Sequence, residues 1–119
     1  MAILVSNRNV TIECSNGLAV SLAYGDGSYS TNRDGKAPVT EAGAVECSTV
    51  EVAILDLTKS GDSHFVQLPC DRNQGVHGWC TADQVARVIG AVADGDLDKA
   101  NDALSPLTPR VTATKLTRV

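Results

Sequence analysis

Two runs of alternating apolar and polar residues, separated by three turn-forming residues, limit the fold of this chain more than any other feature. In residues 10–14 and 18–24 apolar side chains recur at every second position, as they do in half-buried β-strands. A two-residue Asn16-Gly17 turn would put the two apolar rows on opposite faces of the hairpin. A three-residue loop, with Gly17 left-handed, pairs Cys14 with Leu18 and brings both rows to one face. We therefore predict a hairpin in the second register.

Further short strands are expected in the first eighty residues. Apolar and β-branched runs predict strands at 3–5, 44–57, 65–68 and 76–80, with a bulge or bend near Ser48-Thr49. Such a meander is typical of a small barrel or sandwich. Residues 25–43 have no sustained periodicity, and a loop of this length either carries function or is a mobile connection.

Two helices are predicted after the strands. Thr81 and Gln84 fit a capping box at the start of the first helix. Its apolar stripe is expected to pack on the sheet, with a dimer interface as the alternative; the stripe consists of Val85, Val88, Ile89 and Val92. Gly95 can end this helix, and Asp96 can cap a second one that ends by Leu104.

The predicted fold class is mainly β (α+β), a small SH3-like β-barrel or meander followed by a helix pair and a short final strand. We expect a single domain over residues 1–119. It comprises a β core in residues 1–80, a helical segment in 81–105 and a strand or tail in 110–119.

The charge balance limits the classes of partner. The net charge is −4, and no run of three basic residues occurs, so we expect neither a nucleic-acid nor a membrane partner. No export signal and no apolar run of membrane-spanning length is visible, which favours a cytoplasmic location. The acidic balance fits a protein partner better, and the chain could also form a homo-oligomer.

Residues 43–88 resemble the bacterial SH3-like domain, a small five-stranded barrel. Gly43 before Val50-Glu51-Val52, the aromatic strand at Phe65-Val66 and the Gly78-Trp79-Cys80 step carry the resemblance. The full helix expected after Trp79 departs from the family pattern. The resemblance implies a binding module for peptides or cell-wall peptidoglycan, with no catalytic residues.

The few large aromatic side chains are the first candidates for a binding site, because they bury the most area per residue. Trp79 and Phe65 are the only Trp and Phe in the chain, and Tyr29 lies in the long 25–43 loop beside Arg33 and Asp34. These five residues are the predicted binding residues.

A weaker candidate is a zinc site at Cys70, His77 and Cys80, with His64 as a fourth ligand. Thiolate and imidazole are the ligands that zinc prefers, but the sequence has no closely spaced Cys pair. The alternatives are a Cys70–Cys80 disulfide or separate reduced thiols, and a cytosolic location favours the thiols. We therefore expect no metal and no cofactor.

No catalytic group stands out in the sequence. Cys80 and His77 are the only local nucleophile and base pair, and Asp56, Asp62 and Asp71 lie where Asp usually forms turns. The leading hypothesis is a small non-enzymatic protein-binding or assembly module, of a kind common among accessory proteins of phages and mobile elements. The alternatives are the thiol or zinc site and a small-molecule pocket between the sheet and the 82–93 helix.

Overall fold

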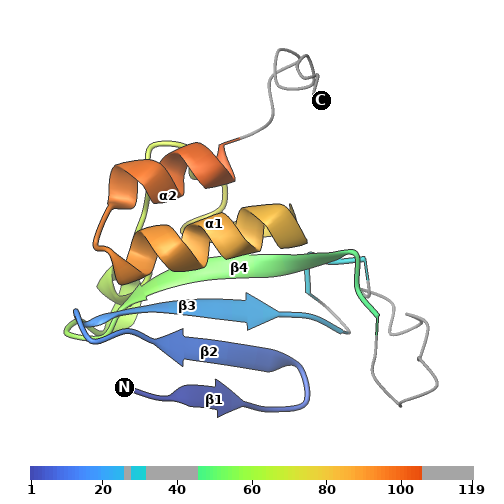
Figure 1. Cartoon of the computed structure of the whole chain (residues 1–119), viewed down its shortest axis with the longest axis horizontal. Helices are drawn as coiled ribbons and strands as arrows, with labels where there is room; N and C mark the ends of the chain where they lie inside the picture. Colours follow the sequence, from blue (N-terminus) through green and yellow to red (C-terminus); the bar gives the residue numbers. More distant parts are fainter. Residues whose placement is uncertain (26–27, 32–45, 106–119) are drawn as a thin grey trace.

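Five antiparallel strands form one sheet in the order in which they occur in the chain (Figure 1). A computed structural model describes residues 1–25, 28–31 and 46–105. The strands are β1 (Ile3–Val5), β2 (Asn9–Glu13), β3 (Leu18–Ala23), β4 (Thr49–Asp56) and β5 (Val76–Thr81). A 3-10 turn, η1 (Gly61–His64), follows β4, and α1 (Ala82–Ala93) and α2 (Leu97–Leu104) follow β5.

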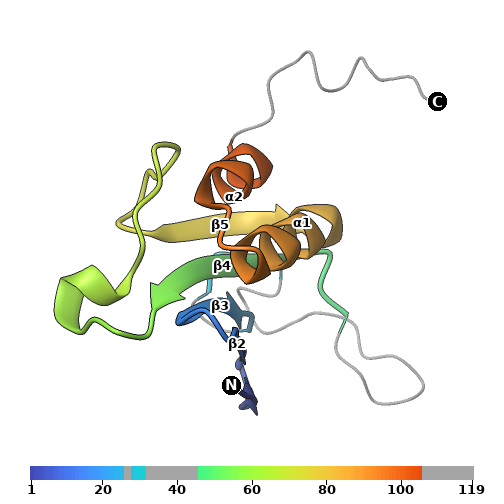
Figure 2. The same cartoon turned by 60° about the vertical axis from the view of Figure 1, so that its left-hand side comes forward.

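The mainly β, α+β class is confirmed, but a closed barrel is not. Among the residues that the structure describes, β1 and β5 are the two edges of the sheet, which is therefore open. Both helices lie on one face of the sheet (Figures 1 and 2). The helices bury the apolar face that closure into a barrel would otherwise have to bury. The short strand predicted at 110–119 lies outside the described residues.

The β2–β3 hairpin has the register predicted from one-sided burial. Ile12 pairs with Val20, and the Cys14 N–H donates to the Leu18 carbonyl at 2.8 Å. Gly17 has a φ of +85°, in the left-handed region that the three-residue loop requires. The local pattern therefore specified both the turn and the inward-facing row.

The first helix begins and packs as its sequence predicts. Thr81 and Gln84 form the complete capping box, and the stripe faces the sheet with Val88 and Val92 fully buried. Val85 and Ile89 are half-buried and pack against the same core, as predicted for packing on the sheet. The Gln84 side chain also donates to the carbonyl of Ala103 near the end of α2, at 3.1 Å.

The strand predicted at 65–68 is wrong. Phe65 makes one isolated bridge with Leu55, and the chain then leaves the sheet. The edge of β4 explains this difference. The Val66 N–H still donates to the Ile54 carbonyl at 2.9 Å, but the following residue of β4, Ala53, already pairs with Val76 of β5. The 65–68 segment therefore has no further edge of β4 to pair with.

Asn16 connects the hairpin loop to the end of α1. Its Oδ1 accepts from the Leu18 N–H at 3.1 Å, and its Nδ2 donates to the Val92 carbonyl at 2.8 Å. The second bond satisfies one of the carbonyls that a helix leaves without a partner in its last turn. One side chain thus joins segments 76 residues apart in the sequence.

Candidate functional site at the bulge of β5

The pairing of β4 with β5 contains a β-bulge. Gly78 and Trp79 of β5 together lie opposite Glu51 of β4, so β5 carries one extra residue. The irregularity predicted near Ser48-Thr49 therefore lies in the neighbouring strand. Trp79 has a φ of +51°, which is uncommon for a bulky side chain. Bulges occur often beside functional sites, where they change the direction of a side chain.

The bulge brings Trp79 against Tyr29. Their ring centroids are 5.4 Å apart at an interplanar angle of 32°, and the Trp79 N–H donates to the Tyr29 carbonyl at 2.8 Å. A Cβ atom added to Gly78 would lie 2.7 Å from the Cβ of Tyr29, closer than side chains tolerate. Only glycine at position 78 therefore permits this approach.

Residues 28–31 are held against the sheet by further hydrogen bonds. The Tyr29 N–H donates to Oε1 of Glu51 at 3.0 Å. Thr31 and Thr49 exchange bonds, each backbone N–H donating to the other's hydroxyl, at 3.1 and 3.2 Å. Tyr29 is therefore positioned by backbone contacts that do not depend on its ring.

A hollow of about 550 Å³ lies beside the two aromatic rings. Its lining comes from all of β5, from Gln84 in the first turn of α1, and from Tyr29, Cys70, Arg72, Asn73 and Leu104. We call it the aromatic hollow. Trp79 is 53% exposed, so the indole remains accessible although it packs against Tyr29. Large, half-exposed aromatic side chains beside a concavity are typical of binding sites.

The predicted site residues divide between two places. Tyr29 and Trp79 lie together with Cys70, His77 and Cys80 around the aromatic hollow. Phe65 is 37% exposed and lines a separate hollow, whose other lining residues are Asp56, Lys59, Asp62, Ser63, Val66, Gln67 and Leu97. Arg33 and Asp34 lie outside the described residues. Sequence reasoning missed Glu51 and the role of Gly78, although an isolated Gly in a strand is a known signal of a bulge.

His77 is the buried polar group of the aromatic hollow. Its side chain is 9% exposed, and its Nε2 is buried without a hydrogen-bond partner in the described part of the chain. Burial lowers the pKa of His77 and outweighs the nearby charge of Asp71, which raises it. The imidazole is therefore neutral at pH 7. A buried Nε2 without a partner carries a desolvation cost.

Cys70 and Cys80 are protonated thiols in this environment. All four cysteines are free, so the disulfide alternative is overturned. Burial raises the pKa of Cys80 to about 11, with Cys70 adding to the effect, and burial also raises the pKa of Cys70. The thiolate is the form that attacks carbon or binds zinc, and it is disfavoured here. The described residues contain no group of three or more His, Cys, Asp or Glu that could hold a metal ion.

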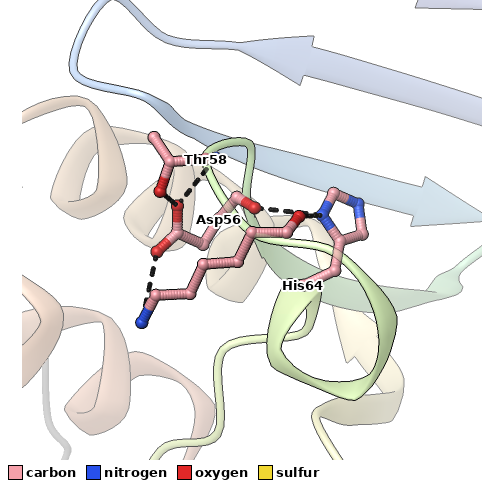
Figure 3. Close-up of polar contacts among 4 residues, drawn as sticks. Asp56, Thr58 and His64 are labelled. Carbon is pink, nitrogen blue, oxygen red and sulfur yellow. Dashed lines mark hydrogen bonds and ion pairs between the residues drawn. The ribbon is translucent and has the colours of Figure 1, made fainter.

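His64 belongs to a different cluster at the end of β4 (Figure 3). Its Nδ1 donates to the carbonyls of Asp56 at 3.0 Å and Lys59 at 3.1 Å. The Asp56 carboxylate accepts from the Thr58 hydroxyl at 2.6 Å and forms an ion pair with Lys59 at 3.9 Å. The bonds from Thr58 are the main cause of the lowered pKa of Asp56. These contacts hold a turn together, as predicted for Asp56, and do not assemble a reactive site.

A smaller, largely apolar hollow of about 330 Å³ lies between the start of β4 and α1. Residues 47–50, Val85 and Ile89 are among those that line it. This is the place where the sequence suggested a small-molecule pocket. Its lining offers shape and apolar surface but few polar groups to orient a ligand.

Comparisons of the chain with models of known protein families, with curated proteins and with solved structures gave no match. The resemblance of residues 43–88 to the bacterial SH3-like domain therefore stays a prediction. In the parts of the chain that the structure describes, no helix has the length and apolarity needed to cross a membrane.

Proposed function

We propose that this chain is a non-enzymatic protein-binding module whose binding site is the aromatic hollow. One observation carries the proposal: the half-exposed indole of Trp79 is kept at a φ of +51° by the bulge of β5. Backbone strain of this kind costs on the order of 1 to 3 kcal/mol and occurs often at functional sites. The strain here presents a large aromatic side chain beside a concave surface.

The chemistry of the aromatic hollow favours an extended peptide segment as ligand. The rings of Tyr29 and Trp79 offer a surface for an apolar or ring-containing side chain. The net charge of −4 supports a protein ligand over a nucleic acid. A bacterial SH3-like relationship and a cytoplasmic location, which the free thiols support, are parts of the same proposal.

The test is selection of peptides from a random display library on the immobilised full chain, followed by titration in solution. Trp79 is the only tryptophan, so its fluorescence reports on the site in the native chain. The anisotropy of a fluorescently labelled peptide reports on binding by every variant, including Trp79→Ala. We expect Trp79→Ala and Tyr29→Ala to weaken binding by about tenfold or more, as hot-spot aromatics do. Phe65→Ala is the matched control, because Phe65 is also a partly exposed aromatic but lies in another hollow.

Two results would contradict the proposal. One is a selected peptide whose affinity is unchanged by Trp79→Ala. The other is an equal loss of affinity with Phe65→Ala, since that would place the binding surface elsewhere.

A second candidate function is small-molecule binding in the smaller hollow between β4 and α1. Its apolar lining at Val50, Val85 and Ile89 is the observation that favours it. Native mass spectrometry of the purified protein should then show a bound organic molecule that Ile89→Trp excludes. The peptide-binding proposal predicts no such adduct.

A further inference from the structure

The outer edge of β1 carries backbone hydrogen-bonding groups that pair with no other strand of the described residues. The Glu13 N–H donates to the Ala2 carbonyl and the Ser6 N–H to the Asn9 carbonyl, each at 2.8 Å. In an antiparallel pair, alternate residues point their backbone groups at the neighbouring strand. The N–H and C=O groups of Ile3 and Val5 therefore point away from β2, along the open edge of the sheet.

β1 also exposes apolar side chains without the usual protection of an edge strand. Ile3 is 68% exposed, Leu4 51% and Val5 72%. Natural edge strands are commonly guarded by a charge, a proline or a bulge, and β1 contains none of these. Its short length is the one protective feature present.

Ile3 and Val5 lie on the same face of the sheet as the core. Ile3 pairs with Ile12, and Ile12 pairs with the fully buried Val20, so their side chains share one face. α1 packs over β3, β4 and β5, and α2 packs on α1, whereas β1 lies at the far side of the sheet from the helices (Figure 1). The apolar face thus continues past the helices to an open edge.

We propose that β1 pairs with β1 of a second copy of this chain, antiparallel and about a two-fold axis at Leu4. In this register Ile3 lies opposite Val5 of the second copy, and Val5 opposite its Ile3. Because the free backbone groups belong to Ile3 and Val5, each of these pairs exchanges two hydrogen bonds. The two five-stranded sheets become one continuous sheet.

The side chains of β1 favour a second copy as the occupant. Two-fold pairing places Ile3 beside the second copy's Val5 on the face that carries the helices, and Leu4 beside the second copy's Leu4 on the other face. Every exposed apolar side chain of β1 thereby meets an apolar neighbour, and β-branched cross-strand pairs are favourable. An isologous contact of this kind closes on itself and leaves no free edge at β1.

The contact involves three residues on each copy, so the dimer should be weak. Interfaces below the standard size bind transiently, and we expect a dissociation constant on the order of 10 µM. Sedimentation of the full chain from about 1 to about 200 µM should show the change from monomer to dimer.

Val5→Lys should leave the chain monomeric across this range, because each copy would place a charge against the apolar Ile3 of the other. Leu57→Lys is the matched control: Leu57 is a 40% exposed apolar residue that follows β4, and its substitution should leave dimerisation unchanged. Circular dichroism checks that both variants are folded. A monomeric native chain at the highest concentration, or equal effects of the two substitutions, would overturn the proposal.

Disulfide trapping tests the register. Leu4 is opposite itself in the proposed dimer, in a non-hydrogen-bonded pair whose Cα atoms lie about 4.5 Å apart, within disulfide reach. Leu4→Cys should therefore cross-link two chains under mild oxidation, whereas Val5→Cys faces Ile3 and should cross-link poorly. More efficient cross-linking by Val5→Cys, or none by either variant beyond that of the native chain, would contradict the two-fold pairing at Leu4.

Discussion

Replacing Trp79 by alanine and by glycine tests whether the bulge of β5 holds a strained residue. Either change removes the half-buried indole and its contact with Tyr29. The lost burial of about 100 Å² of apolar area, together with the ring contact, should cost about 2 to 3 kcal/mol of the free energy of unfolding. An alanine at position 79 still has a Cβ atom that disfavours the positive φ of this residue, whereas a glycine has none and adopts it without that penalty.

The glycine variant should therefore be about 1 kcal/mol more stable than the alanine variant. In a regular strand the order is reversed, because glycine is about 0.5 to 1 kcal/mol less stable than alanine there. Ala23→Gly supplies this comparison directly, since Ala23 lies in β3 with regular pairing. The assay is urea unfolding followed by far-ultraviolet circular dichroism, which does not depend on the tryptophan.

A result in which Trp79→Ala is as stable as Trp79→Gly would refute the reasoning. It would mean that residue 79 relaxes out of the left-handed region once the indole is gone. In that case the strain would be a consequence of the ring packing and not of the bulge itself.

Three further predictions follow from the same region. Gln74 and Gly75 have φ values of +53° and +90°, as in a type I′ turn, so Gln74→Asn should raise the free energy of unfolding by about 0.5 kcal/mol, measured by urea unfolding. Gly78→Ala should displace Tyr29, lower stability by about 2 kcal/mol or more and shift the fluorescence maximum of Trp79. Burial lowers the pKa of His77 below its ordinary value of 6.5, so the unfolded chain binds more protons between these two values. The contribution of neutral His77 to the free energy of unfolding is therefore complete above pH 6.5 and is lost as the pH falls through the pKa of His77 in the folded chain. His77→Asn should abolish this loss, as measured by unfolding experiments at several pH values.

Each of these predictions has a result that contradicts it. A Gln74→Asn variant less stable than the native chain would show that the turn does not select its residues by φ. Native fluorescence in Gly78→Ala would show that Tyr29 does not depend on the missing Cβ. A His77→Asn variant with the native pH dependence would assign that dependence to other groups.

Local signals explain the parts of the fold that the sequence predicted well. The hairpin register followed from one-sided burial and Gly17, and both helix starts followed from their capping residues, Thr81 and Asp96. These features depend on residues a few positions apart. The sequence therefore contains all the information that is needed to predict them.

The failures depend on pairing between distant segments. Whether residues 65–68 form a strand depends on how much of the edge of β4 is already occupied by β5. Barrel closure likewise depends on what covers the apolar face, and here the helices cover it. Tyr29 and Trp79 were predicted as binding residues because aromatic side chains are rare in this chain. The contact between their rings was not predicted, since it requires the bulge at Gly78.

The hydrogen bond from Asn16 to Val92 has a consequence for how the molecule opens. Because Asn16 in the turn of the β2–β3 hairpin bonds a carbonyl in the last turn of α1, neither element can unfold while the other keeps all its hydrogen bonds. We expect backbone amides in β3 and in the second half of α1 to exchange with deuterium together, as one cooperative unit. Asn16→Ala would separate the two sets of exchange rates, with the amides at the end of the helix exchanging first.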